Sequence, residues 1–282
     1  MFPKPIEKSS RAAQLSYQGL LPIALLMWLA PLIAVALFSI KPDTDFTTGN
    51  YWGLPSAFGG FENYGKVFFQ SDMPRYLMNS FLITVPTVIG AVALSCMTGF
   101  ALGIYKFKSN LWIFFMFVAG NFVPFQILMV PVRDLTLDMG LYNTKTGLVL
   151  FHIAFQTGFC TLFMRNFIRA LPYELIEAAR VEGVAEWRIF WFVVLPLMKP
   201  AIAALSVLIF TFIWNDYFWA VVLTQGAESQ PVTAGITSFN AQYRAAYHLM
   251  SAGSIVAALP PVAMFFLMQR HFIAGLTLGA VK

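Results

Sequence analysis

Residues 77–104, LMNSFLITVPTVIGAVALSCMTGFALGI, form a stretch without a single charged side chain. About 20 apolar residues, at roughly 1.5 Å each, are enough to cross the hydrocarbon core of a bilayer as an α-helix. A helix is also one of the two folds that satisfy every backbone hydrogen bond inside lipid. The stretch therefore predicts a membrane-spanning helix, and the rest of the chain repeats the pattern.

Five further runs are long and apolar enough to cross a membrane. With the first, the predicted spans are 17–40, 77–104, 111–130, 147–164, 200–223 and 251–268. We therefore expect an all-α membrane protein with six transmembrane helices. Residues 1–16 would form an N-terminal tail, and residues 17–282 a single six-span domain.

The composition excludes other classes of protein. Of the 282 residues, 59% are hydrophobic and only 11% are charged, whereas a soluble domain carries about 25% charged residues. The apolar residues are clustered and do not alternate, which argues against an outer-membrane barrel. The net charge of +5, from 18 Lys and Arg against 13 Asp and Glu, is typical of basic cytoplasmic loops and does not indicate nucleic-acid binding.

The placement of the basic residues predicts the orientation of the chain. With the N-terminus in the cytoplasm, twelve Lys and Arg fall in inside segments and six in outside segments. This excess favours cytoplasmic placement of both termini. The small residues Ala34 and Ala36 offer a signal-peptidase site, but the apolar run is longer than a usual signal segment, so we expect an uncleaved anchor.

The predicted inside segment 165–199 is the most informative part of the chain. Residues 169–200 read RALPYELIEAARVEGVAEWRIFWFVVLPLMKP. Pro172 suits the first turn of a helix, Gly183 suits a left-handed helix end, and a second short helix would begin near Ala185. The spacing of Leu171, Leu175 and Ala179 predicts one apolar stripe. Such a helix–turn–helix fits either a groove on a soluble partner or the lipid headgroups.

The same segment resembles a family signature. Residues 177–179 (Glu-Ala-Ala), Gly183 and the run 193–196 (Val-Val-Leu-Pro) resemble the "EAA…G…I-x-L-P" signature of binding-protein-dependent ABC-transporter permeases, with Val193 where Ile is usual. Residues 214–219 (WNDYFW), 231–235, 252–261 and 275–282 also resemble the carbohydrate-uptake members of that family. Over roughly residues 15–282 the chain is similar to the six-span subunit of the maltose-transporter type.

The resemblance implies both partners and roles. It implies a permease of the bacterial inner membrane that works with a second, homologous permease subunit, two ATPase subunits and an extracytoplasmic sugar-binding protein. The loop 165–199 would be the coupling helix that docks into the ATPase. The residues carried over to that role are Glu174, Glu177, Ala178, Ala179, Gly183 and Glu186.

The sequence shows no nucleotide-binding motif of the phosphate-loop type. It contains no G-x-x-x-x-G-K-[ST] phosphate loop, so ATP and Mg²⁺ would be bound by a separate ATPase and this chain would carry no cofactor and no enzyme activity. The alternative function is an ion-coupled secondary transporter or channel. That class needs intramembrane charges and often inverted repeats, and the sequence shows one such charge and no visible repeat.

The intramembrane charge is Asp216, which lies beside Trp214 and Asn215 in the fifth predicted span. A charge inside a membrane is expensive, so it suggests a function, and aromatic faces with polar groups suit a sugar. The favoured alternative for Asp216 is structural, namely capping of a helix or pairing with a neighbouring helix. Asn121 and Gln126 flank Pro124 in the third span, where they either line a cavity or bond another helix.

Overall fold

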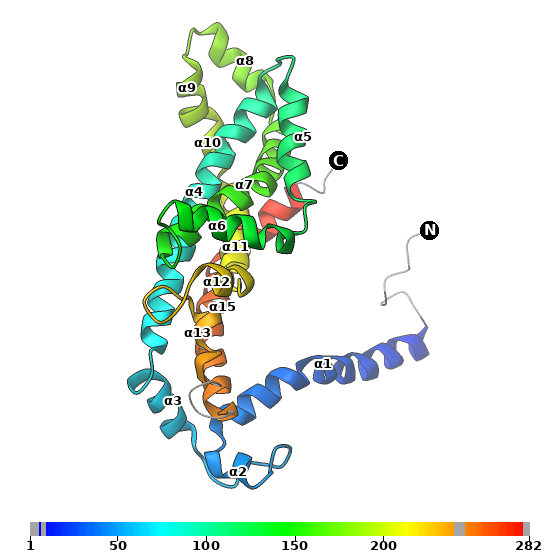
Figure 1. The fold of residues 1–282 in the computed structure, drawn as a ribbon. Helices are drawn as coiled ribbons and strands as arrows, with labels where there is room; N and C mark the ends of the chain where they lie inside the picture. The colour runs from blue at the N-terminus through cyan, green and yellow to red at the C-terminus, as the bar shows by residue number, and fades with distance from the viewer. Residues whose placement is uncertain (1–5, 7–9, 240–245, 279–282) are drawn as a thin grey trace. The chain divides into compact units, whose positions relative to one another are not determined.

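A computed structural model describes residue 6 and residues 10–239 and 246–278, with side chains described up to residue 269. Every regular element in these ranges is a helix (Figure 1). The elements are α1 (Arg11–Ile40), α2 (Asp43–Thr47), α3 (Gly60–Phe69), α4 (Met73–Ile104), α5 (Asn110–Gly120), the 3₁₀ helix η2 (Phe125–Leu128), α6 (Met129–Asp138), α7 (Lys145–Arg169), α8 (Glu174–Val181), α9 (Glu186–Arg188), the π-helix η3 (Ile189–Val194), α10 (Leu195–Leu197), α11 (Lys199–Trp214), α12 (Phe218–Leu223), α13 (Val232–Gly235) and α15 (Tyr247–Leu278).

The helices confirm the predicted fold class. Within the described residues, four helices are long and apolar enough to cross a membrane: α1, α4, α7 and residues 247–269 of α15. Two bent helix pairs bring the number to six if each pair is one span. The ends of the predicted N-terminal tail and C-terminal motif, residues 1–5, 7–9 and 279–282, lie outside the described residues.

Two predicted spans are not continuous helices. In the third, α5 ends at Gly120 and the chain turns by 87° into residues 125–138, because Pro124 cannot donate a backbone hydrogen bond and the Asn121 side chain instead bonds the carbonyl of Phe117 at 2.9 Å. The fifth also differs from the prediction. It breaks after Trp214. At its other end, residues 186–197 of the predicted inside segment, where we expected a second short helix to begin near Ala185, form a helical segment joined to α11 by a 73° bend.

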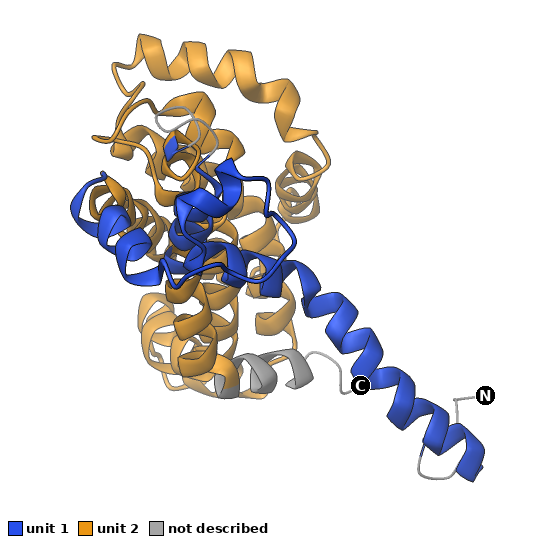
Figure 2. Ribbon diagram, turned by 90° about the horizontal axis from the view of Figure 1, so that it is seen from below, with its two compact units in different colours: residues 1–71, 239–256 blue, residues 72–238, 257–282 orange. Residues whose placement is uncertain are grey.

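The chain divides into two compact units (Figure 2). Unit 1 comprises residues 1–71 and 239–256. It holds the short helices α2 and α3, and Lys41 is fully buried within it. The ammonium of Lys41 donates to the carbonyls of Asn50 at 2.6 Å and Tyr51 at 2.9 Å, while Asn63 donates to the carbonyl of Lys41 at 2.8 Å.

Unit 2 comprises residues 72–238 and 257–282 and contains the core. Helices α4 and α7 pack closely there because two glycines of α4 face α7. A Cβ on Gly99 would lie 3.0 Å from the Cβ of Met164, and one on Gly103 would lie 3.2 Å from Ile168. These glycines, four residues apart, thus let the two helices pack closely. Helix α7 ends at Arg169, directly before the segment that begins at residue 170.

Candidate functional site

The segment of residues 170–189, which we call the elbow, folds as two short helices joined by a sharp turn. Helix α8 ends where Gly183 adopts a φ of +75°. The amide of Val184 then donates to the carbonyl of Ala179 at 3.0 Å. A Cβ on Gly183 would meet nothing within 4 Å, so the requirement for glycine is the backbone angle alone. The sequence prediction of a left-handed helix end at Gly183 is confirmed.

A bidentate ion pair fixes the angle between the two short helices. Arg180 Nε lies 2.7 Å from Glu186 Oε1, and Arg180 Nη2 lies 3.1 Å from Oε2. The hydroxyl of Tyr105, at the end of α4, donates to Glu186 Oε2 at 2.8 Å. Arg180 Nη1 also donates to the hydroxyl of Tyr173 at 3.1 Å. We call these four residues the clamp, because they tie α8, α9 and the end of α4 together.

Charge and burial in the clamp shift the pKa of its members. The hydrogen bonds from Arg180 hold the pKa of Glu186 below its ordinary value, because they favour the ionised carboxylate. Burial, followed by the Glu186 carboxylate, raises the pKa of Tyr105 to about 12. At neutral pH Glu186 is therefore an ionised carboxylate and Tyr105 keeps its hydroxyl proton, the state in which the hydrogen bond between them forms.

Buried isoleucines attach the elbow to the core of unit 2, and Ile189 at its end is fully buried. Ile176 is 2% exposed and belongs to the hydrophobic core, against which Leu171 and Ala179 also pack. The predicted apolar stripe is wrong at Leu175, which is 46% exposed. The buried face thus passes through Ile176, one position further along the helix.

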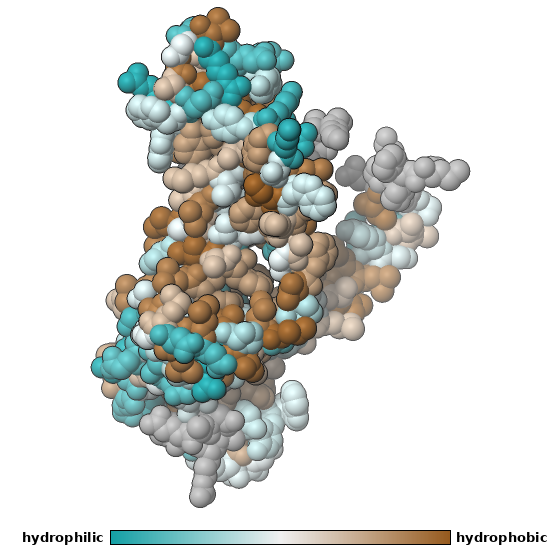
Figure 3. Space-filling view, turned by 45° about the horizontal axis from the view of Figure 1, so that its top comes forward, coloured by the Kyte–Doolittle hydropathy of each residue, from teal (hydrophilic) through white to brown (hydrophobic). Residues whose placement is uncertain are grey.

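The opposite face of the elbow is exposed and mixed in character. Glu174, Glu177 and Ala178 are exposed, and so are the apolar Val181 and Trp187, at 88% and 59%. Figure 3 shows hydrophilic residues gathered at the end of unit 2 that carries the elbow. Acids next to exposed apolar groups suit the surface of a protein partner. Of the six residues predicted for this role, Glu186 is bound into the clamp and Ala179 is partly buried.

The helix break at the fifth predicted span is organised by Asp216. Its carboxylate accepts a hydrogen bond from the amide of Ala220 at 3.1 Å and so caps α12, as short polar side chains do at helix starts. His152 Nε2 on α7 lies 3.5 Å from Asp216 Oδ2, with side chains 2% and 12% exposed. No sequence motif pointed to His152, because it and Asp216 lie 64 positions apart along the chain.

Trp214, beside the same break, is a packing residue in the described structure. It is 2% exposed, and its indole N–H donates to the carbonyl of Ala257 at 2.9 Å. Its ring contacts Phe81 and Phe210 with centroids 4.8 and 5.5 Å apart. Asn215 is exposed and donates to the carbonyl of Thr211 at 2.8 Å. The structure thus holds Trp214 inside and presents Asn215 at the surface.

A cavity of about 300 Å³ lies near Asn121. Its lining residues come from α5, α7 and α11 and are mostly apolar: Asn121, Phe155, Gln156, Phe159, Leu208, Ile209 and Phe212. Gly158 allows the close approach of α5, since a Cβ there would lie 2.7 Å from the side-chain nitrogen Nδ2 of Asn121. Gln126, which we grouped with Asn121, is exposed and does not line this cavity.

Two buried polar atoms near this region have no hydrogen-bond partner among the described residues. They are Nε2 of Gln156 and Nδ1 of His152, which lie one helical turn apart on α7. Leaving a buried polar group unpaired costs roughly 1–3 kcal/mol. Phenylalanine rings beside an unpaired amide are what a sugar needs, because its C–H face stacks on the ring and its hydroxyls bond the amide.

The chain matches a known family along most of its length. The profile of the family described as "Binding-protein-dependent transport system inner membrane component" matches residues 95–277. The arabinooligosaccharides transport system permease protein AraQ of Halalkalibacterium halodurans is 32% identical over 255 residues, which cover 89% of this chain and 90% of that protein. The lactose transport system permease protein LacG of Rhizobium radiobacter is 32% identical over 222 residues, 79% of this chain and 80% of that protein.

A solved structure shows the same fold. One chain of a bacterial ABC transporter involved in the import of the acidic polysaccharide alginate superposes with a TM-score of 0.79. The match covers 94% of this chain and 99% of that chain at 22% sequence identity. At this level of identity the likeness concerns the fold alone.

Proposed function

The chain belongs to the family of binding-protein-dependent transport system inner membrane components, and from that premise we propose how it works in the import of a sugar. It is the permease subunit of an ATP-driven ABC importer that moves a sugar or sugar derivative into the cell by alternating access. The similarity to permeases for arabinooligosaccharides and lactose supports a carbohydrate substrate. It favours this function over an ion-coupled transporter or channel.

The elbow carries the mechanism. Its clamp and its buried Ile176 make it a rigid body attached to the end of α4, and its acidic and apolar face is free to contact a partner. We assign Glu174, Glu177 and Ala178 to contact with the ATPase, and Gly183, Ala179 and Glu186 to the shape of the elbow. When ATP closes two ATPase subunits, the elbow is displaced as one piece and moves the membrane helices with it. Only contacts that differ between the two states can drive such a change.

The partners follow from the family description. The description names dependence on a binding protein, and we propose that this is an extracytoplasmic protein for sugars and that a separate ATPase binds ATP and Mg²⁺. We propose that the second permease is a homologous but different subunit, so that the pair is a heterodimer. We also propose that the chain lies in the bacterial inner membrane with both termini and the elbow in the cytoplasm, as its basic residues predict.

We place the sugar path along the cavity of Asn121 and Gln156. The unpaired amide of Gln156 and the neighbouring phenylalanines are the observation behind this placement. Gln126 and Asn215, which are exposed in membrane-spanning segments, extend the polar path. Trp214 and Asp216 have a structural role beside this path. Both make hydrogen bonds within the chain that stabilise the break between α11 and α12.

The test is uptake of sugar by the assembled transporter reconstituted in liposomes. Glu177→Lys reverses the charge of an exposed elbow residue, and we expect uptake to fall about tenfold, within the range of typical coupling free energies. Glu62→Lys, which reverses another exposed acid outside the elbow, serves as the matched control and should transport normally. Normal uptake by Glu177→Lys at equal insertion would contradict the assignment of the elbow.

A further inference from the structure

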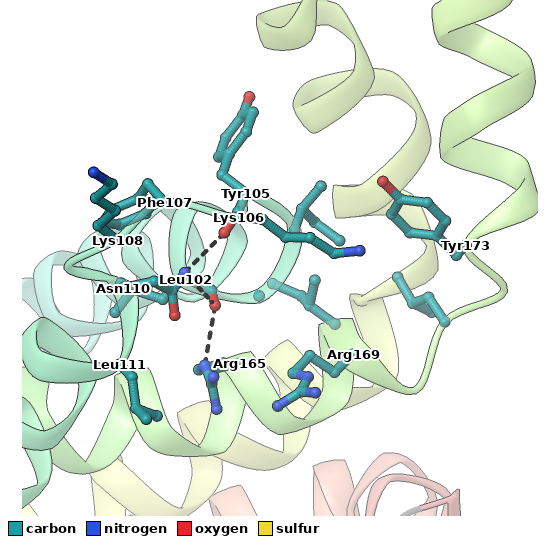
Figure 4. Close-up of a pocket in the computed structure, with 14 residues that line it drawn as sticks. Leu102, Tyr105, Lys106, Phe107, Lys108, Asn110, Leu111, Arg165, Arg169 and Tyr173 are labelled. Carbon is teal, nitrogen blue, oxygen red and sulfur yellow. Dashed lines mark hydrogen bonds between the residues drawn. The ribbon is translucent and has the colours of Figure 1, made fainter.

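A large pocket of unit 2 lies where three of its helices reach the same end of the bundle. It has a volume of about 710 Å³ and is lined by the last residues of α4, the first residues of α5 and the last residues of α7 (Figure 4). Its far wall is formed by Leu171 and Tyr173 at the start of the elbow. Neither the transport path nor the ATPase-facing surface of the elbow uses it.

The pocket is strongly cationic. Lys106, Lys108, Arg165 and Arg169 line it, and its lining includes no Asp or Glu. In the part of the chain that the structure describes, no carboxylate lies within 4.0 Å of any of these four cations. Four positive charges without a counter-charge repel one another, so an anionic ligand would relieve an existing cost.

The floor of the pocket is preorganised. Arg165 is 8% exposed, its Nε donates to the carbonyl of Leu102 at 3.1 Å, and its guanidinium lies 3.9 Å from the ring centroid of Phe114. Asn110 donates to the carbonyls of Leu102 and Tyr105 at 3.1 and 2.8 Å. The Nε bond is the one hydrogen bond of the Arg165 guanidinium among the described residues, which leaves its other N–H donors for a ligand.

The depth of the pocket matches that of lipid headgroups. The apolar helices α4 and α7 end at it, and α5 begins at it with Leu111 and Trp112 exposed at 54% and 74%. Exposed tryptophan at the end of a spanning helix marks the boundary between hydrocarbon and water. Phe107, 44% exposed, lies in the short loop at the same level. The cations therefore sit beside an exposed apolar surface, which suits contact with acyl chains.

We propose that this pocket binds the phosphate of an anionic phospholipid headgroup from the leaflet on the elbow side. Arginine at its floor provides planar, paired donors that match phosphate oxygens, and Arg165 and Arg169 are one helical turn apart on α7. Lys106 adds a point charge from the α4–α5 loop. Figure 4 shows Lys106 and Lys108 extending in different directions, so Lys106 and the two arginines form the binding set. The assignment of this leaflet to the cytoplasmic side rests on the proposed function.

Native mass spectrometry of the transporter, released from nanodiscs with its partner subunits, tests the site. Discs contain either phosphatidylcholine alone or phosphatidylcholine with phosphatidylglycerol. The double variant Lys106→Gln/Arg169→Gln leaves the buried Arg165 in place. The matched control, Lys66→Gln/Arg133→Gln, removes one lysine and one arginine elsewhere. We expect phosphatidylglycerol retained by the pocket variant to fall about tenfold or more relative to the control.

Further measurements distinguish a lipid phosphate from inorganic phosphate, and they test the lipid site separately from the proposed transport function. Equal phosphatidylglycerol retention by the pocket variant and the control would overturn the site. Inorganic phosphate that binds in phosphatidylcholine discs and displaces phosphatidylglycerol would assign the pocket to a soluble anion and also overturn it. Lipid retention does not depend on sugar uptake. Failure of Glu177→Lys to reduce uptake would thus contradict the proposed function while leaving this measurement unaffected.

Discussion

The elbow and the cavity beside Asn121 differ in how their polar groups are satisfied. In the elbow, Arg180, Glu186, Tyr105 and Tyr173 bond one another. In the cavity region, Gln156 Nε2 and His152 Nδ1 have no partner within the described residues. A satisfied network fixes one geometry, whereas an unpaired buried group gains most from a ligand or water. The elbow therefore suits transmission of force, and the cavity region suits transient binding.

Replacement of the left-handed glycine should damage the elbow most. Gly183→Pro fixes φ near −65°, where the turn needs +75°. We expect sugar uptake to fall by about 100-fold, towards the upper end of typical coupling effects, while membrane insertion and sugar-independent ATP hydrolysis persist. The measurement is the ratio of sugar transported to ATP hydrolysed in liposomes.

Gly226→Pro is the matched control for this change. Gly226 also has a positive φ, +73°, and lies in a loop outside the elbow. Its replacement should lower stability without changing the ratio of transport to hydrolysis. If both glycine variants changed that ratio equally, the elbow would not differ from an ordinary loop.

Reversal of one clamp charge should have the next largest effect. Glu186→Arg places two guanidiniums together and leaves Tyr105 without its acceptor, so we expect uptake to fall about tenfold. The double swap Arg180→Glu/Glu186→Arg restores the ion pair and should recover part of the loss. A double swap that is no better than the single variant would show that the clamp is not the reason for the defect.

Removal of the unpaired Gln156 amide should raise stability and lower sugar uptake. Gln156→Leu abolishes a buried unpaired donor, so the free energy of unfolding should rise by about 1 kcal/mol. Uptake should fall about fivefold, because a sugar hydroxyl loses a bond of similar strength. Thermal unfolding and uptake of the same preparation measure both quantities.

Thr157→Val provides the control for that variant, since the Thr157 hydroxyl already bonds the carbonyl of Ile153 at 2.5 Å. It should not raise stability and should leave uptake unchanged. An unchanged uptake in Gln156→Leu would remove the cavity from the sugar path.

Acid should loosen the clamp, with the smallest effect. The pKa of Glu186 is lowered from its ordinary 4.5 by the Arg180 hydrogen bonds. Its stabilising contribution is therefore complete above pH 4.5 and is lost as the pH falls through the lowered value. Since the Glu186 side chain is 43% exposed, amide exchange in residues 170–189 should quicken by no more than about fivefold. Glu186→Gln should abolish the pH step, and a step that persisted would belong to another group.

The sequence was sufficient for features encoded by neighbouring residues. The spans follow from apolar runs, and the turn of the elbow follows from Gly183 with Glu186 three residues later. The helix ends were harder to predict. Asn121 and Asp216 bond their own backbone and break helices that hydrophobicity alone would continue. A window of mean hydropathy does not register such local competition for backbone hydrogen bonds.

Contacts between residues far apart in the chain could not be predicted from the sequence. His152 meets Asp216, and Gln156 shares a cavity with Asn121 and Phe212, only because α5, α7 and α11 pack together. Tyr105 reaches Glu186 from 81 positions away. The position of Ile176 as the buried residue of α8 likewise depends on how the elbow meets the core, and helical spacing alone selected Leu175 instead.

The central claim is that an ATPase grips the exposed face of the elbow, and one cross-linking measurement tests it directly. The two native cysteines, Cys96 and Cys160, are buried, so Ala178→Cys introduces a single exposed thiol on α8. A photoactivated cross-linker attached there in the assembled transporter should join the permease to the ATPase, and the same reagent on Thr47→Cys should not. Cross-links from position 178 to lipid alone, with none to the ATPase, would contradict the account.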